Sequence, residues 1–312
     1  MFYLISALYL GWSLGANDAA NIFGTAVSSR MVKFITAAVL SSVFVILGSI
    51  LQGRPGIETI GKISTMGLGM AGISSLAAAI AVTIMTILKL PVSTSQAVVG
   101  SIVGVGIMQR QAVLTGIDKV IICWIGTPIG GCIFSIVLYL ILARIINRFQ
   151  PSRASSDFVI RAGLIIAGCY GAYALGANNV ANVTGVFYGA GLFSIKTAAL
   201  IGGVSIALGI LTFSKGVMKT VGKGIVSLDG YSALIVVLSN AVTVHIYAFI
   251  GVPISTSQAV VGAVLGIGLL KRAEALKKRA ILGVLSGWIA TPFTAALVSM
   301  FIYFVTHLRY VG

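Results

Sequence analysis

Long apolar stretches follow one another along almost the whole chain and are separated by short clusters of basic and turn-forming residues. The stretches 34–52, 63–88 and 120–143 are examples that carry no charged residue. Each is about as long as, or longer than, the ~20 residues that an α-helix needs to cross a bilayer. None alternates apolar and polar positions as the strands of a membrane β-barrel do. The pattern therefore predicts an all-α polytopic membrane protein.

Composition strengthens this prediction. Hydrophobic residues make up 58% of the 312 residues and charged residues only 9%, whereas soluble domains have about 45–50% apolar and about 25% charged residues. The apolar N-terminal residues lack the basic start and the cleavage signal of a signal peptide, so we expect them to begin a retained helix. We expect a multi-pass protein of the cell membrane.

The net charge of +15 could suggest a nucleic-acid partner, but the basic residues form short clusters between the apolar stretches. A bilayer distributes basic residues in this way, so we expect no nucleic acid to bind. Cys123, Cys132 and Cys169 lie singly within apolar stretches. We interpret them as packed core residues rather than as disulfide or metal-binding residues, and we expect no organic cofactor.

Three segments of the first half of the chain return in the second half, in the same order. Residues 15–21 return at 176–182, residues 91–100 at 253–262 with one substitution, and residues 124–128 at 288–292. The offsets of 161, 162 and 164 residues are nearly constant, which indicates a duplication into a first repeat, 1–150, and a second repeat, 151–312. Paired repeats in an apolar chain are typical of secondary transporters.

The repeated decapeptide predicts a re-entrant helical hairpin in each repeat, between a second and a last spanning helix. A hairpin returns to its own side, so each repeat crosses the membrane an odd number of times and the two repeats have inverted topology. With the N-terminus outside, the basic clusters 144–161, 215–223 and 271–279 lie in the cytoplasm, as the positive-inside rule requires. We expect the first of these clusters to be a short linker between the repeats.

The decapeptide also predicts an anion-binding site. Pro91 and Pro253 stop the preceding element, and the Ser and Thr residues that follow are suitable N-caps for the runs 97–108 and 259–270. Runs of about 12 residues are only ~18 Å long, so their N-termini should lie near the membrane midplane. Free backbone NH groups and the helix dipole attract an anion there. The alternative is that these residues only cap a kinked helix or bond a neighbouring helix.

A second polar pattern predicts a cation site. Asn17, Asp18 and Asn21 share one helix face, and we place Asp18 as the one carboxylate deep in the bilayer, where acids are rare and functional. Residues 178–182 repeat this face without the charge. Such oxygen-rich faces suit a hard cation, and the neighbouring glycines would allow the helix to unwind and offer carbonyl groups. Hydrogen bonding between helices is the alternative interpretation.

Charge links the two patterns. A phosphate carries about −1.5 to −2 charges near neutral pH and Asp18 adds about −1, whereas two helix N-termini supply only about +1. About two monovalent cations would neutralise the remainder. Because an uncompensated buried ion is costly, we expect anion and cations to enter together, as in symport.

The motifs Gly-Ala-Asn-Asp-x-x-Asn and Pro-Val-Ser-Thr-Ser-Gln, which occur in both halves, resemble those of the inorganic phosphate transporter (PiT) family. The resemblance implies a sodium- or proton-coupled phosphate symporter that forms a homodimer. It implies that phosphate binds Thr94, Ser95, Gln96, Thr256, Ser257 and Gln258, with Asn21 and Asn182 nearby. It implies that sodium binds Asp18, Asn17, Ser93, Asn178, Asn179 and Ser255, together with Asn21 and Asn182.

The chain departs from the family pattern in two respects. Asn179 stands where many relatives have Asp, and Val45 and Val237 stand where mammalian members have glutamates. Glu58 matches an acidic position of the family, but an ion pair with Lys62 is an equal alternative. Because only Asp18 and His245 could titrate in the core, and His245 is better explained as a hydrogen-bonded helix residue, we favour sodium over protons.

Other functions remain as alternatives. A proton-coupled phosphate symporter or a sulfate symporter would use the same architecture, and an anion channel would also use helix N-termini. An intramembrane hydrolase would need a Ser–His pair or two aspartates, whereas we place only one Asp and one His in the membrane, and they lie in different halves. Gln96 and Gln258 could recognise phosphate by accepting the hydrogen that sulfate lacks.

Overall fold

A computed structural model describes residues 2–64, 66–87, 92–110, 117–149, 153–224, 228–271 and 278–308, which form twelve helices and no strand. The first half contributes α1 (Phe2–Asp18), α2 (Ala20–Ser28), α3 (Phe34–Gln52), α4 (Arg54–Ile63), α5 (Leu68–Ile87), α6 (Thr94–Met108) and α7 (Ile117–Phe149). The second half contributes α8 (Arg153–Gly189), α9 (Ile195–Gly224), α10 (Gly230–Ile250), α11 (Thr256–Leu270) and α12 (Lys278–Leu308). The all-α prediction is confirmed.

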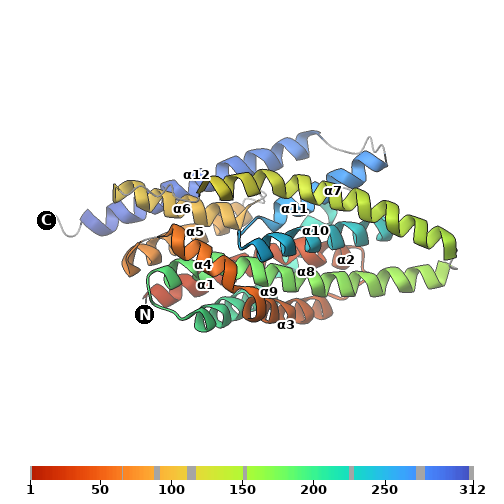
Figure 1. Cartoon of the computed structure of the whole chain (residues 1–312), viewed down its shortest axis with the longest axis horizontal. Helices are drawn as coiled ribbons and strands as arrows, with labels where there is room; N and C mark the ends of the chain where they lie inside the picture. Colours follow the sequence, from red (N-terminus) through yellow and green to blue (C-terminus); the bar gives the residue numbers. More distant parts are fainter. Residues whose placement is uncertain are drawn as a thin grey trace.

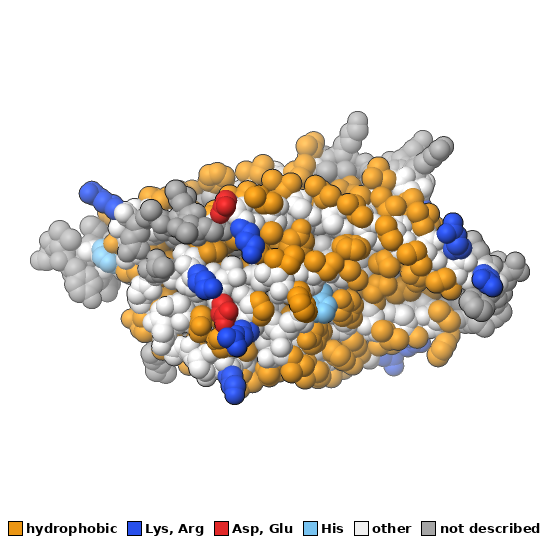
Figure 2. All heavy atoms as spheres, in the orientation of Figure 1, with side chains coloured by type: hydrophobic (Ala, Val, Ile, Leu, Met, Phe, Trp, Pro, Cys, Tyr) orange, Lys and Arg blue, Asp and Glu red, His pale blue; other side chains and the backbone are white. Residues whose placement is uncertain are grey.

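The bundle has the surface of a membrane protein. Seven of its described helices are long and apolar enough to cross a bilayer, namely α3, α5, α7, α8, α9, α10 and α12. Large apolar side chains point outward from them, and Ile35 and Phe249 are 74% and 76% exposed. Figure 2 shows apolar side chains covering the middle of one face, with most charged side chains toward its two ends. The exposed belt therefore faces lipid, and this is a multi-pass membrane protein.

Two hairpins enter the bundle from opposite ends (Figure 1). In the first, α5 and α6 run antiparallel, and the Ser74 and Ser101 hydroxyls lie 2.9 Å apart. In the second, α10 turns into the loop before α11 at Gly251, which has the left-handed φ of 78° that a glycine tolerates. Neither hairpin crosses the bundle, although α5 and α10 are long enough to span. The predicted re-entrant hairpins and inverted repeats are confirmed.

The tips of the two hairpins touch. Ser95 Oγ donates to the Ile254 carbonyl at 2.7 Å, and Ser257 Oγ donates to the Val92 carbonyl at 2.9 Å. Each of these bonds is the counterpart of the other in the repeated sequence. Such reciprocal contacts are what a two-fold relation between the halves produces, and its axis passes between the tips.

The two halves are intertwined. The first helix of each half packs against the second helix of the other, as α1 does on α9 and α8 does on α3. Glycines allow these crossings, because a Cβ on Gly15 would collide with the Ile206 carbonyl and one on Gly176 with the Val45 carbonyl. Each hairpin also packs on the last helix of the other half, α6 on α12 and α11 on α7. The repeats of the sequence are therefore not separate bodies in space.

The third repeated segment serves this packing. Pro128 lies inside α7 and Pro292 inside α12, and their backbones face Gly262 and Gly100 so closely that neither glycine could carry a Cβ. Because proline lacks the N–H of a helical hydrogen bond, it weakens the helix locally. The Thr127 hydroxyl next to the proline donates to the Cys123 carbonyl at 2.6 Å.

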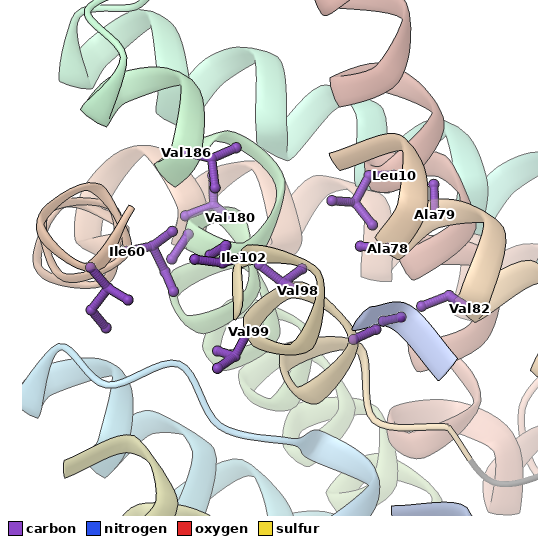
Figure 3. Packing of buried hydrophobic residues seen from close by; sticks show 14 of the residues in the cluster. Leu10, Ile60, Ala78, Ala79, Val82, Val98, Val99, Ile102, Val180 and Val186 are labelled. Atoms are coloured by element: carbon purple, nitrogen blue, oxygen red, sulfur yellow. The ribbon is translucent and has the colours of Figure 1, made fainter. Parts of the chain in front are cut away.

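The hydrophobic core joins both halves. Figure 3 shows Ile60 of α4, Val98 and Ile102 of α6, and Val180 and Val186 of α8 packed together. The short helix α4, which the hydrophobic pattern did not indicate, buries Ile57 and Ile60 fully. This cluster supports the first hairpin from behind its tip.

Two expectations from the sequence need correction. The basic stretch 144–161 is mostly helical, because α7 continues to Phe149 and α8 begins at Arg153. Only residues 150–152 separate these two helices in the sequence, and they lie outside the described residues. The first helix is interrupted only at Ala19, between α1 and α2, and this residue keeps helical angles of −56° and −27°, so the chain does not open into an extended segment there. The glycines near the polar face allow close helix crossings instead.

Candidate substrate and ion site

The predicted site residues converge where the hairpin tips meet α1, α2 and α8. All of them belong to the described part of the chain, and all are buried except Asn17 and Ser257, which are half-buried. Pro91 lies outside the described residues, whereas Pro253 precedes α11 as expected. Residues from both halves, more than 150 positions apart, thus form one polar cluster inside an apolar bundle.

Asp18 lies at the centre of this cluster and is 1% exposed. Its Oδ2 accepts hydrogen bonds from Asn179 Nδ2 at 2.8 Å and from Thr94 Oγ1 at 3.1 Å. Because Asp18 and Asn179 are equivalent positions of the two repeats, their bond crosses the two-fold axis. The two ion pairs among the described residues lie elsewhere. The carboxylate is therefore hydrogen-bonded but not neutralised by a basic side chain.

One asparagine in each half connects that half to the hairpin of the other half. Asn21 Nδ2 donates to Thr256 Oγ1 at 3.1 Å, and Asn182 Nδ2 donates to Ser95 Oγ at 2.9 Å. The Oδ1 atom of Asn182 is buried and has no hydrogen-bond partner. This oxygen is free to accept a hydrogen bond or to coordinate a cation.

The asparagines one turn earlier differ between the halves. Asn178 holds the second hairpin tip, donating to the Ile254 carbonyl at 2.9 Å and accepting from its N–H at 3.1 Å. Asn17 instead donates to Thr86 on α5 at 2.9 Å. The two-fold relation is therefore broken here, and the first half leaves its asparagine partly exposed.

The helix N-termini at the tips have the predicted caps. Ser93 Oγ accepts from the Gln96 N–H at 3.4 Å, and Ser255 Oγ accepts from the Gln258 N–H at 3.3 Å. The expectation that hydroxyl side chains begin α6 and α11 is confirmed. The other N-terminal NH groups and the positive ends of both helix dipoles face the tip region, where an anion is favoured.

Sequence reasoning missed Asn240, in the middle of α10. It is 2% exposed, its Nδ2 donates to the Asn21 carbonyl at 3.2 Å, and its Oδ1 has no hydrogen-bond partner. The available signal was the polar pair Ser239-Asn240 within an otherwise apolar hairpin arm. The repeat itself concealed it, because Ala78 stands at the equivalent position of α5.

Other candidates lie outside the cluster. His245 bonds the Tyr170 hydroxyl at 2.8 Å and Gln52 Oε1 at 2.7 Å, which confirms a hydrogen-bonded helix residue. It also lines an apolar surface pocket of about 290 Å³ with α10 residues. Glu58 pairs with Arg54 at 2.8 Å rather than with Lys62, and this hydrogen bond raises the pKa of Arg54. Val45 and Val237, at the positions of the mammalian glutamates, are buried.

A family model for phosphate transporters matches the chain twice, over residues 14–156 and 147–299. This chain belongs to the phosphate transporter family. The two matches together cover nearly the whole sequence and correspond to its two repeats. A transporter, rather than an enzyme, is what this family and fold support.

Relatives extend the comparison for this family member. It is 29% identical to a permease of Methanocaldococcus jannaschii that is named for phosphate, over 96% of this chain and 95% of the other. It is 27% identical to the sulfate permease CysP of Bacillus subtilis, over 95% and 85%. A solved structure titled the sodium-dependent phosphate transporter superposes with a TM-score of 0.84 at 23% identity, over 98% of each chain. That likeness establishes the transporter's fold.

Proposed function

We propose that this transporter imports inorganic phosphate together with sodium ions by alternating access. The observation that carries the proposal is the meeting of two capped helix N-termini beside one buried, unneutralised carboxylate. The N-termini provide donors for an anion, and Asp18 provides the negative charge for a cation. Both ligands would occupy the point where the two inverted hairpins touch.

In this proposal phosphate binds at the hairpin tips, between the first turns of α6 and α11. The phosphate ligands are Thr94, Ser95, Gln96, Thr256, Ser257 and Gln258, with Asn21 and Asn182 beside them. Sodium binds the surrounding oxygen atoms of Asp18, Asn17, Asn21, Ser93, Asn178, Asn179, Asn182 and Ser255. The unpaired oxygens of Asn182 and Asn240 support this assignment, since carbonyl oxygens are ligands for hard cations.

Charge supports a coupled rather than a single-ligand site. Phosphate and Asp18 together bring about −2.5 to −3 charges, against about +1 from the two helix ends. About two sodium ions would balance the site. An anion channel has no use for Asp18 within the anion site, because the carboxylate would repel the permeating ion.

The tip contacts suggest how binding is linked to movement. The Ser95 and Ser257 hydroxyls each donate to a carbonyl of the opposite tip. A hydroxyl has one hydrogen, so donation to phosphate requires each serine to release that carbonyl. Phosphate would thus replace the direct contact between the hairpins, and the two hairpins could then separate toward either side of the membrane.

Sodium is favoured over protons as the coupling ion. The similar solved protein is titled a sodium-dependent phosphate transporter, and His245 bonds Tyr170 and Gln52 rather than any residue of the polar cluster. Sulfate is the second candidate substrate, because the Bacillus subtilis relative is named a sulfate permease. The two tetrahedral anions have similar shapes, so the architecture alone serves either.

The test is uptake of radiolabelled phosphate by proteoliposomes that contain the purified protein. An inward sodium gradient is compared with an equal potassium gradient, and sulfate is added as a competitor. We expect accumulation only with sodium and little effect of sulfate. Accumulation driven by a pH gradient alone would identify protons as the coupling ions. Strong inhibition by sulfate would favour sulfate as the substrate.

A further inference from the structure

Each hairpin tip carries half of a known helix-capping arrangement. In a capping box, Ser-x-x-Gln, the serine accepts from the backbone N–H of the glutamine, and the glutamine side chain returns to the backbone N–H of the serine. Ser93 and Ser255 make the first of these bonds. Gln96 Oε1 and Gln258 Oε1 make no hydrogen bond, although both side chains are buried, at 5% and 3% exposure.

The two unpaired oxygens are equivalent in the repeat. Most buried polar groups in folded proteins have hydrogen-bond partners. A buried oxygen that lacks a partner at both of two equivalent positions therefore points to a function. An amide oxygen can only accept a hydrogen bond. The tips therefore combine many donors with two buried acceptors at equivalent places beside the same helix N-termini.

This mixture distinguishes tetrahedral anions by their hydrogen atoms. Sulfate has no hydrogen at neutral pH and offers only acceptor oxygens, so a buried amide oxygen beside it stays unpaired and meets like partial charge. Phosphate keeps at least one hydrogen near neutral pH and can donate it. A site built only for hydrogen-free anions would contain donors alone.

We propose that Gln96 and Gln258 are the specificity-determining residues of the site, and that their Oε1 atoms accept the P–O–H hydrogen and so select hydrogen-bearing oxyanions. The proposal rests on the proposed phosphate function and deepens it. Two equivalent acceptors allow the single hydrogen of a phosphate dianion to be received from either hairpin. Asp18 serves a different purpose, because its Oδ2 already accepts from Thr94 and Asn179.

The test uses fluorophosphate, a tetrahedral dianion in which fluorine replaces the hydroxyl group of phosphate. Unlabelled phosphate, arsenate, fluorophosphate, sulfate and selenate are compared as inhibitors of radiolabelled phosphate uptake. We expect arsenate, which bears a hydrogen, to inhibit nearly as well as phosphate. The three hydrogen-free anions should inhibit roughly 10- to 100-fold more weakly, the range produced by one buried acceptor left unpaired. Inhibition by fluorophosphate equal to that by phosphate would overturn the proposal.

Variants then assign the effect to the two glutamines. Gln96→Met and Gln258→Met keep the length of the side chain and remove the amide oxygen. We expect phosphate affinity to fall toward that of fluorophosphate while fluorophosphate affinity changes little, so that selectivity is lost most in the double variant. Gln109→Met is the matched control, since Gln109 Oε1 is also buried and unpaired but lies at the other end of α6. Unchanged selectivity in the double variant would contradict the proposal.

Binding measurements separate this proposal from the coupling mechanism. Displacement of radiolabelled phosphate from detergent-purified protein by the same anions requires neither transport nor a gradient. Selective displacement by arsenate together with sodium-independent uptake would retain the role of the glutamines and refute sodium coupling. Displacement by sulfate or fluorophosphate as strong as that by phosphate would refute the glutamine proposal even if uptake depends on sodium.

Discussion

Asp18 and Asn179 occupy equivalent positions in the two repeats, but only one of them is charged. Their side chains share a hydrogen bond of 2.8 Å across the two-fold axis. The charge is therefore close to the axis whichever repeat supplies it. This arrangement explains how Asn can replace Asp in one repeat without removing the carboxylate from the centre of the molecule.

We predict that Asp18→Asn abolishes sodium-dependent phosphate uptake. Removing one partner of a buried charge pair costs about 3–5 kcal/mol, so apparent sodium affinity should fall on the order of 100-fold or more. The measurement is initial uptake as a function of sodium concentration. Glu58→Gln, which removes a partly exposed carboxylate outside the polar cluster, is the control.

The exchange variant Asp18→Asn with Asn179→Asp tests the position of the charge. Because the two side chains touch at the axis, moving the carboxylate should restore part of the sodium dependence lost in Asp18→Asn. Full activity of Asp18→Asn alone would refute the cation role of this residue.

At the scale of elements, the hairpins depend on contacts that sequence distance does not reveal. Each hairpin is closed at its tip by the other hairpin and is supported by the last helix of the other half. The second hairpin is also closed at its base, where Asp229 caps α10 and pairs with Lys271 at the end of α11. Movement of a hairpin must therefore preserve some of these contacts and break others.

The glycine crossings should tolerate no side chain. We predict that Gly176→Ala separates α8 from α3, because the new Cβ would collide with the backbone of Val45. Overpacking of this kind costs typically about 1–3 kcal/mol or more. Thermal unfolding of detergent-purified protein should occur at a lower temperature than for Gly69→Ala, where the space is open. Equal stability of the two variants would contradict the crossing.

The base of the second hairpin should respond to pH. Partial burial raises the pKa of Asp229, but the hydrogen bonds and charge of Lys271 and the Ser232 bonds outweigh it and lower the pKa below its usual value. A lowered pKa means that the pair stabilises the fold above the unfolded value of about 3.9, and that this stability is lost as pH falls through the folded value.

We therefore predict that Asp229→Asn lowers the free energy of unfolding at pH 7 by up to ~1 kcal/mol, because both partners of the ion pair are partly exposed. The unfolding temperature should fall slightly. The difference from the unaltered protein should persist down to about pH 4–5 and shrink below it. Asp118→Asn, at an exposed carboxylate of α7, is the control. A difference that disappears between pH 7 and pH 5 would contradict the lowered pKa.

At the scale of the whole molecule, inversion places equivalent loops on opposite sides of the membrane. Lys33 lies in the loop before α3 and Lys196 lies in the first turn of α9, directly after the corresponding loop, and both side chains are exposed. With the N-terminus outside, the first loop is cytoplasmic and the second is external. The homodimer that the family resemblance implies stays a prediction.

We predict that a membrane-impermeant maleimide labels Lys196→Cys in intact cells, and labels Lys33→Cys only after the membrane is opened. Both variants are made in a background without Cys123, Cys132 and Cys169. Labelling of both positions from the same side would refute the inverted topology. The opposite pattern would keep the inversion and reverse the orientation.

Much of this protein is determined by local sequence. Helix positions follow from the length of the apolar stretches, because each stretch must satisfy its backbone in lipid by itself. The caps at Ser93 and Ser255 follow from side chains that bond their own next turn. The deep carboxylate of Asp18 and the duplication are equally visible without a structure, and the family motifs already indicated phosphate.

The tertiary structure decided what depends on distant backbones. It alone brings Ser95 to the Ile254 carbonyl and Asn240 to Asn21, and it alone leaves Gln96 and Gln258 without partners. The sequence could not give these results, because a hydroxyl or amide has several possible partners and only the approach of another helix selects one. The exchange of helices between the halves likewise follows from close glycine contacts between residues that lie far apart in the chain.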